Sequence, residues 1–288
     1  MCRLWAYVPR LCLIARNSLN FNHEPFWTHL STLNSVRGLI DMLQFTARPE
    51  TMRTIVDVLS VIVDEARMRF SADGLDINVV DASHVALIKM HVDAAAFETW
   101  DVEETIIAIE LSKLRDLLKL AGPDDLVDVS YDASVGQFDI KVGEVDRSIR
   151  PIDHTLMKDP KVPELELKSK VKIASNKLHK ALQAARLVGE LVTLSLDPRQ
   201  FNLHVQGDQD SVSVSHEAGQ LEDLVAEKPV KSTYSTNYLQ PIVKVIDGAV
   251  DSVEVCFDDK YPLNLNFEIA EGAGSVTYFL APRIDDTI

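Results

Sequence analysis

The sequence predicts an α+β fold of two similar domains, each an antiparallel sheet backed by two helices. A helix–turn–strand pattern occurs twice, at residues 114–132 and 239–258. The two copies lie roughly 120 residues apart, which is a normal domain length. Strand-like segments bounded by turn residues surround both copies. At 288 residues the chain is long enough to bury a substantial core in two domains.

The two copies agree in detail. Each has apolar residues at helical spacing, followed by a lysine at the same offset, Lys119 and Lys244. A turn containing glycine and an alternating strand then end in an aromatic residue plus aspartate, Tyr131-Asp132 and Phe257-Asp258. This self-similarity indicates an internal duplication.

In the first half, residues 43–47 are expected to form a strand. Pro49 and Glu50 suit the first turn of a helix, and apolar spacing continues that helix to Val63. A second helix over residues 111–121 is stopped by Gly122-Pro123. The other strands expected here are 67–71, 75–80, 85–92, 105–110, 126–131, 136–142 and 145–151, with a hairpin turn at Asp73-Gly74.

Three prolines then punctuate a stretch without periodicity, which predicts an inter-domain linker at residues 151–164 between domains at 42–150 and 165–288. In the second half, Ser175 or Asn176 is expected to cap a helix that ends at Gly189. Ser235 or Thr236 is expected to cap another, in which Pro241 predicts a late start or a kink. The strands expected here are 165–173, 191–196, 201–207, 211–217, 230–234, 252–257, 262–270 and 275–282.

The composition limits the partners of the chain. The formal net charge is −15, so contact with nucleic acid requires a localised basic face. No apolar run is long enough to cross a bilayer. The three cysteines form no CxxC pair, which favours a reducing compartment without structural disulfides. Residues 1–41 differ in composition and are expected to be a disordered extension, or the product of a wrongly assigned start codon with Met42 as the initiator.

No common catalytic or nucleotide-binding motif is present. Residues 81–84 contain Asp, Ser and His, but in an extended segment Asp81 and Ser83 point to one face and His84 to the other. Neighbours on one strand cannot form the hydrogen-bond chain of a hydrolase triad. His84 is therefore interpreted as a structural or binding residue, with a hydrolase that uses His84 kept as an alternative.

Basic residues lie away from the apolar faces of all four expected helices. If the helices share one side of the sheets, these cations form a positive surface that attracts phosphates without reading sequence. Asp57 and Asp116 would weaken that attraction, and ordinary solvated helix faces are the alternative. The cations are Arg53, Lys113, Arg115, Lys119, Lys177, Lys180, Arg186 and Lys244.

Two alternating strands, residues 136–142 and 211–217, are candidate sheet edges, one in each half. An exposed edge invites pairing with another chain. Pairing between copies would be head-to-tail and closes into a ring when the rotation allows. The alternative is that both edges are covered within the chain.

Two segments carry a family resemblance. Residues 74–87, GLDINVVDASHVAL, and residues 261–286, YPLNLNFEIAEGAGSVTYFLAPRIDD, resemble the sliding clamps of the proliferating cell nuclear antigen (PCNA) family, as in archaea and eukaryotes. The resemblance covers the chain from Met42 onward. It implies a homotrimeric ring of six similar domains, with helices lining a hole that duplex DNA passes through.

The resemblance further implies a DNA replication and repair scaffold without catalytic activity, cofactor, metal or membrane contact. Such a clamp tethers DNA polymerase, nuclease and ligase through short peptide motifs, confers processivity, and is opened by a clamp loader. Its location would be cytoplasmic with the nucleoid in an archaeon, or nuclear in a eukaryote. The alternative within the family is one subunit of a heterotrimeric clamp.

The resemblance also implies a pocket for partner peptides near the linker. Phe279 replaces a frequent tyrosine, and Pro160 stands where an apolar residue is usual, a role that Met157 is expected to fill. Gln183 and Asn237 replace common basic residues, so the hole is expected to be less positive than usual. The pocket residues carried over are Val80, His84, Val85, Met157, Val162, Pro163, Pro262, Phe279, Ala281 and Pro282.

Overall fold

The computed structural model describes residues 42–283, so the expectations for residues 1–41 lie outside the described part. Within that part the helices are α1 (Pro49–Leu59), α2 (Leu111–Leu118), α3 (Ser175–Val188) and α4 (Thr236–Ala249). The strands before the linker are β1 (Met42–Ala47), β2 (Glu65–Ser71), β3 (Gly74–Val80), β4 (Ala86–Asp93), β5 (Thr99–Val102), β6 (Thr105–Glu110), β7 (Val127–Asp132), β8 (Gln137–Val142) and β9 (Val145–Ile149). Those after it are β10 (Lys170–Ala174), β11 (Leu191–Leu196), β12 (Gln200–Gln206), β13 (Ser211–Glu217), β14 (Asp223–Val225), β15 (Val230–Ser235), β16 (Ser252–Cys256), β17 (Leu263–Ile269) and β18 (Gly274–Leu280).

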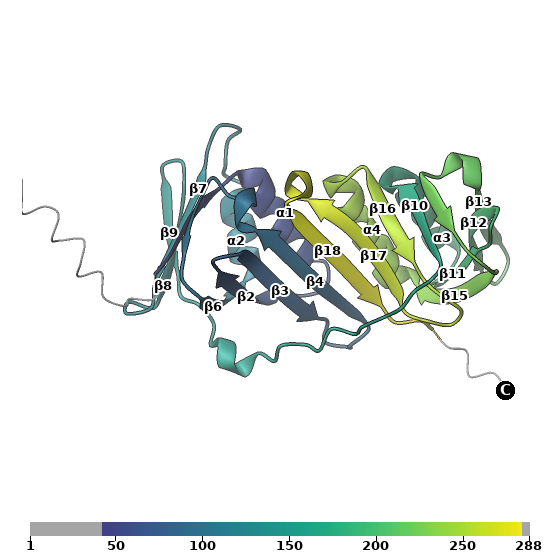
Figure 1. Cartoon of the computed structure of the whole chain (residues 1–288), viewed down its shortest axis with the longest axis horizontal. Coiled ribbons are helices and arrows are strands. Elements are labelled where there is room, and N and C mark those ends of the chain that lie inside the picture. Colours follow the sequence, from purple (N-terminus) through teal and green to yellow (C-terminus); the bar gives the residue numbers. More distant parts are fainter. Residues whose placement is uncertain (1–41, 284–288) are drawn as a thin grey trace, which may run out of the picture. The chain divides into compact units, whose positions relative to one another are not determined.

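These strands form three antiparallel sheets. A five-stranded sheet has the order β5-β1-β7-β8-β9, and a four-stranded sheet has the order β13-β12-β11-β15. Between them in Figure 1 lies a nine-stranded sheet, β14-β10-β16-β17-β18-β4-β3-β2-β6. Strand β18 pairs with β4 from Gly274↔Val92 to Leu280↔Ala86, so the end of the chain completes a sheet begun in its first half.

The four helices lie together on one side of the nine-stranded sheet (Figure 1). α1 packs against α2, and α3 packs against α4. Strand alternation explains this arrangement: in β2, Ala66, Met68 and Phe70 are buried in the core, whereas Arg67 and Arg69 lie on the opposite face. The nine-stranded sheet therefore has a helix-covered face and an open face.

The helices differ from the sequence predictions at their ends. α2 ends at Leu118 because the next turn tightens, with amides of residues 120 and 121 bonded to the carbonyls of Leu117 and Leu118. The predicted cap of α3 is wrong: its N-cap is Ala174, and the buried Ser175 hydroxyl has no hydrogen-bond partner within residues 42–283. Ser235 is the N-cap of α4, but its side chain makes no capping bond.

Of the two alternatives predicted for α4, a late start or a kink, the late start does not occur, because the helix begins at Thr236 and contains Pro241 in its second turn. A proline there removes one hydrogen bond, to the carbonyl of Asn237. Asn237 is exposed, so water can satisfy that carbonyl. The cost is therefore small enough for the helix to continue through the proline.

The strand prediction differs most around the linker. The expected strand at 165–173 is reduced to β10, which starts at Lys170. β5 and β14 are short strands that the sequence did not predict. No helix within residues 42–283 has both the length and the apolar content needed to span a membrane.

Candidate functional sites: a linker pocket and a helical face

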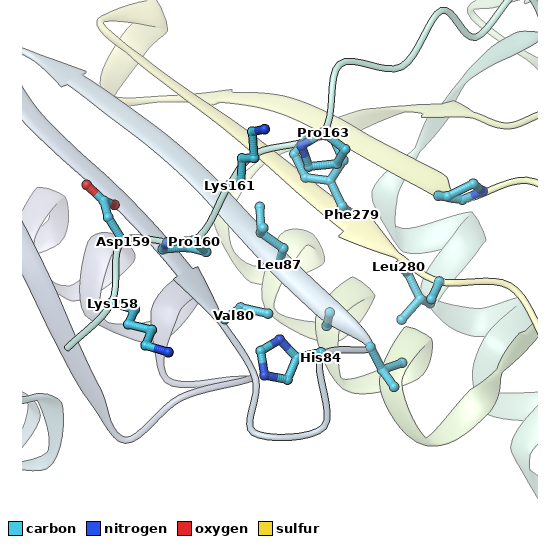
Figure 2. A pocket seen from close by; sticks show the side chains of 14 residues that line it. Val80, His84, Leu87, Lys158, Asp159, Pro160, Lys161, Pro163, Phe279 and Leu280 are labelled. Carbon is cyan, nitrogen blue, oxygen red and sulfur yellow. The ribbon is translucent and has the colours of Figure 1, made fainter. Parts of the chain in front are cut away.

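A cavity of about 480 Å³ opens on the nine-stranded sheet beside the linker. Figure 2 shows the linker running past Val80, His84 and Leu87 to Pro163, beside which Phe279 lies. Most of the exposed lining is apolar, as a pocket for an aromatic or aliphatic side chain requires. The lining residues are Val80, His84, Val85, Ala86, Leu87, Lys158, Asp159, Pro160, Lys161, Pro163, Pro262, Phe279, Leu280 and Ala281.

The loop between β3 and β4 is organised by the buried carboxylate of Asp81. It accepts backbone N–H bonds from Ser83 (3.0 Å), Val85 (2.7 Å) and Ala86 (2.6 Å), and the hydroxyl of Tyr238 donates to it at 2.8 Å. Burial raises the pKa of Asp81, but these four hydrogen bonds outweigh it and hold the pKa below the usual value. The carboxylate therefore stays ionised and fixes the loop.

His84 occupies the left-handed backbone region, with φ of 56°. Few residues other than glycine adopt this conformation without support. Here the amide of His84 donates to the carbonyl of Asp81 at 2.9 Å, which closes the turn. The Asp81 loop thus presents the His84 ring to the pocket (Figure 2).

The linker is fastened to the open face of the sheet by one aspartate. Asp159 accepts from Arg67 at 2.8 Å and from Arg69 at 2.9 Å, both on β2. Upstream, a bridge pairs Ile152 with Ala108 of β6. These contacts fix the course of the linker and bring Pro160 into the pocket wall.

The helices carry the eight predicted cations, and most of these bind other parts of the chain. Arg53 of α1 donates to the carbonyls of Leu118 (2.9 Å) and Ala121 (2.8 Å), at the carboxyl end of α2. The other partners are Glu110 for Lys113 (2.9 Å), Asp57 for Arg115 (3.3 Å), Asp116 for Lys119 (2.9 Å), the Gln220 carbonyl for Lys177 (3.0 Å) and the Gln240 side chain for Arg186 (2.8 Å).

Lys180 on α3 and Lys244 on α4 are exposed and make no side-chain hydrogen bond or ion pair within residues 42–283. Lys119, Lys177 and Arg186 are also exposed, so their contacts can exchange with a ligand. The guanidinium of Arg53, in contrast, is committed to the carbonyls of Leu118 and Ala121 at the end of α2. The helical face is therefore only weakly basic.

Comparison with known proteins identifies the family. The family described as "Proliferating cell nuclear antigen, N-terminal domain" matches residues 44–150. The DNA polymerase sliding clamp of Methanosarcina mazei is 32% identical over 245 residues, which cover 85% of this chain and 99% of that protein. The chain belongs to the PCNA family of DNA sliding clamps. The DNA polymerase sliding clamp of Methanocella arvoryzae is 30% identical over the same shares of the two chains.

Solved structures agree with this assignment. The structure described as the C-terminal region of FEN-1 bound to A. fulgidus PCNA matches this clamp with a TM-score of 0.79 and 28% identity, over 85% of this chain and 99% of that one. PCNA from Thermococcus kodakaraensis matches with a TM-score of 0.77 over 84% and 100%, and its 23% identity supports the fold alone. The predicted α+β clamp fold is confirmed.

Seven of the ten predicted pocket residues of the clamp line the cavity: Val80, His84, Val85, Pro163, Pro262, Phe279 and Ala281. Met157, Val162 and Pro282 do not line it. Met157 closes the 3-10 turn His154–Leu156 instead, with its amide bonded to the His154 carbonyl. The role expected of Met157 falls to Pro160, which the Asp159 contacts hold in the wall.

Sequence reasoning missed the charged part of the lining, Lys158, Asp159 and Lys161. These three residues could have been predicted from their position next to Pro160, because the linker was already expected to lie at the pocket. The alternative of a hydrolase that uses His84 finds no support in the geometry. The Asp81 carboxylate accepts hydrogen bonds from backbone amides and from Tyr238, and among residues 42–283 it has no hydrogen bond to the His84 ring. The described residues also contain no group of three or more His, Cys, Asp or Glu side chains suited to a metal ion.

The sheet edges of the clamp correct one prediction. β13, residues 211–217, is an edge strand as expected. β8 is not an edge, because β9 pairs along it from Phe138↔Ile149 to Val142↔Val145. The two edges of the five-stranded sheet are therefore β9 and β5. The alternation of β8 in the sequence does not show that β9 lies outside it, because only the pairing decides which strand is outermost.

Proposed function

We propose that this clamp closes into a homotrimeric ring around duplex DNA and acts as a non-enzymatic scaffold. The observation that carries the proposal is the pair of edges β9 and β13, one at each end of the strand orders given above. They come from opposite halves of the chain and are different strands. Contact between β9 of one copy and β13 of the next is then head-to-tail, the kind of contact that closes rings.

The ring is tested by the molar mass in solution of the chain starting at Met42, measured by light scattering. A stable trimer is expected. Val145 in β9 is 41% exposed, so Val145→Lys should lower the trimer fraction by placing a charge at the joint. Val135 lies in the β7–β8 turn and is 61% exposed, so Val135→Lys is the matched control. A monomer or dimer at micromolar concentration would favour the heterotrimer alternative.

In the proposed ring, the helix-covered side faces the DNA. Lys180 and Lys244 supply free ammonium groups there, and Lys119, Lys177 and Arg186 add exposed charge. Lys180→Ala with Lys244→Ala should weaken binding to a duplex oligonucleotide and flatten its salt dependence, because each lost phosphate contact lowers the slope by about 0.9. The exposed pair Lys141→Ala and Lys228→Ala is the control of equal charge. Equal losses in both variants would remove the helices from the DNA face.

The linker pocket is the proposed docking site for peptides of DNA polymerase, clamp loader, nuclease and ligase. The apolar lining supports this, as does the A. fulgidus PCNA that carries the C-terminal region of FEN-1. We expect a peptide with the sequence of that FEN-1 region to bind the clamp, as measured by calorimetry. Phe279→Ala should abolish this binding without unfolding the clamp. Leu156→Ala is the control, since Leu156 is 80% exposed in the same linker and does not line the pocket. Binding unchanged in Phe279→Ala would show that the docking site lies elsewhere.

We further propose that the clamp works where the DNA is, with the nucleoid if the source is an archaeon or in the nucleus otherwise. The domain limits 42–150 and 165–288, with the linker at 151–164, remain part of this proposal. They fit the position of the linker, which leaves the five-stranded sheet after β9 and rejoins the fold at β10.

A further inference from the structure

The pocket wall contributed by the linker is basic, although the chain is strongly acidic. Lys158, Asp159 and Lys161 are the lining residues with formal charge. Asp159 is already bonded to Arg67 and Arg69, so its negative charge is compensated within the protein. The three charged lining residues sum to +1, and the two arginines that bind Asp159 from outside the lining raise this sum to +3, against a formal net charge of −15 for the chain.

The two lysines are available to a ligand. Both are exposed, and within residues 42–283 neither makes an ion pair or a side-chain hydrogen bond. Figure 2 shows the Lys158 side chain extending on the side of the linker where His84 lies, and the Lys161 side chain pointing to the opposite side. A peptide anchored in the pocket would therefore pass an ammonium group on either side of the linker.

We propose that the linker pocket selects peptides in which acidic residues flank the aromatic anchors, with carboxylates paired to Lys158 and Lys161. The inference deepens the proposed peptide-binding function and rests on it. Carboxylate groups fit because an ammonium group binds them through charge-assisted hydrogen bonds. Basic flanks would instead meet like charges at the pocket, which works against them.

Nucleic acid is the other polymer that a basic patch attracts, and the surroundings of the lysines favour a peptide. The lysines border a cavity whose other walls include Val80, Leu87, Pro163 and Phe279. Apolar walls of that kind take side chains, whereas a phosphate backbone needs a continuous run of cations. The pocket also lies on the open face of the nine-stranded sheet, away from the helices.

The test uses three synthetic peptides that share one helical turn with aromatic anchors and differ in their flanks, which are Asp/Glu, Ser/Gln or Lys/Arg. Fluorescence anisotropy measures their affinity for the full chain. At about 0.1 M salt the acidic peptide should bind roughly fivefold more tightly than the neutral one, since exposed ion pairs are individually weak. The difference should shrink at about 0.5 M salt because the Debye length falls.

The variant Lys158→Glu with Lys161→Glu should reverse the order of affinity of the acidic and basic peptides. Lys141→Glu with Lys228→Glu changes the net charge equally at exposed positions outside the pocket lining, and should preserve the order. If all three peptides bind wild type equally, this inference is wrong and peptide docking stands. If none binds, the proposed docking function is wrong as well.

A single-stranded oligonucleotide provides the remaining comparison. Both double variants lower the net charge equally, so both should weaken binding of the oligonucleotide. We expect the Lys158→Glu, Lys161→Glu variant to lose no more affinity for it than the Lys141→Glu, Lys228→Glu control loses. An oligonucleotide that binds through these two lysines, together with peptides that show no flank preference, would overturn the inference and assign the patch to nucleic acid.

Discussion

Tyr238 of α4 ties the helical face to the pocket loop, and Tyr238→Phe should loosen that loop. The change removes only the hydroxyl that donates to Asp81 at 2.8 Å. Hydrogen bonds to charged groups contribute about 1.5–3 kcal/mol. Because Tyr238 is half-buried and three backbone amides stay on the carboxylate, we expect the lower end, about 1.5 kcal/mol. That loss corresponds to a Tm lower by roughly 3–6 °C for a chain of this size.

The assay is thermal and urea unfolding at one protein concentration, because association shifts apparent stability. Tyr261→Phe is the matched control, since Tyr261 is 45% exposed and its hydroxyl has no hydrogen-bond partner within residues 42–283. The affinity of the FEN-1 peptide should fall in Tyr238→Phe and not in the control, because Asp81 positions His84 and Val85 in the pocket wall.

The pH dependence gives a second readout. The folded-state pKa of Asp81 is lowered, so its stabilising contribution is present above the ordinary pKa of about 3.9 and is lost as the pH falls through the folded value. Part of that contribution comes from Tyr238. The stability difference between wild type and Tyr238→Phe should therefore be full at neutral pH and shrink below about pH 4. A difference that matches the control, or persists undiminished at about pH 3, would refute the reasoning.

Three further changes probe the fold. Arg53→Ala should lower the unfolding free energy by about 1–3 kcal/mol, because the carbonyls of Leu118 and Ala121 lose the guanidinium as a donor. Lys180→Ala should stay within about 0.5 kcal/mol, and equal melting temperatures would contradict this. Gly74→Ala should lower the unfolding free energy by more than about 3 kcal/mol, since φ is +148° and a Cβ would meet a carbonyl oxygen at 2.2 Å. Gly136→Ala, whose Cβ would meet open space, should lower it by about 1–2 kcal/mol; urea unfolding measures both. Burial raises the pKa of Cys256 to about 12, so its thiol should react with a disulfide reagent at pH 8 only as fast as the protein unfolds, and rapid native labelling would contradict that.

The general fold followed from the sequence because the signals for it are local. Helical spacing around Leu114 and Leu239, and alternation in segments such as β12 and β17, lie within single elements. The sheet order could not be read in the same way. β8 alternates between core and solvent as an edge or an inner strand can, and its place beside β9 depends on pairing partners elsewhere in the chain.

The pocket was predictable where its residues lie in or beside the family motifs, and least predictable in the linker before Pro163. Val80 is the last residue of β3 and Phe279 the second-last of β18, and both lie within the family motifs. Pro160 entered the wall because Asp159 binds two arginines more than eighty residues earlier in the chain. No local pattern in the sequence specifies such a contact.

The same long-range contacts explain why counting cations overestimates the positive charge that the helices offer to DNA. Arg53 was expected to face DNA, yet it binds carbonyls 65 and 68 residues further along the chain. Lys113 and Lys119 pair with acids three residues earlier in the sequence. A protein that held DNA by adhesion would need these cations free, because affinity grows with each phosphate neutralised. A closed ring retains DNA by enclosure instead, so its helices can commit cations to their own stability and still leave Lys180 and Lys244 for loose contact.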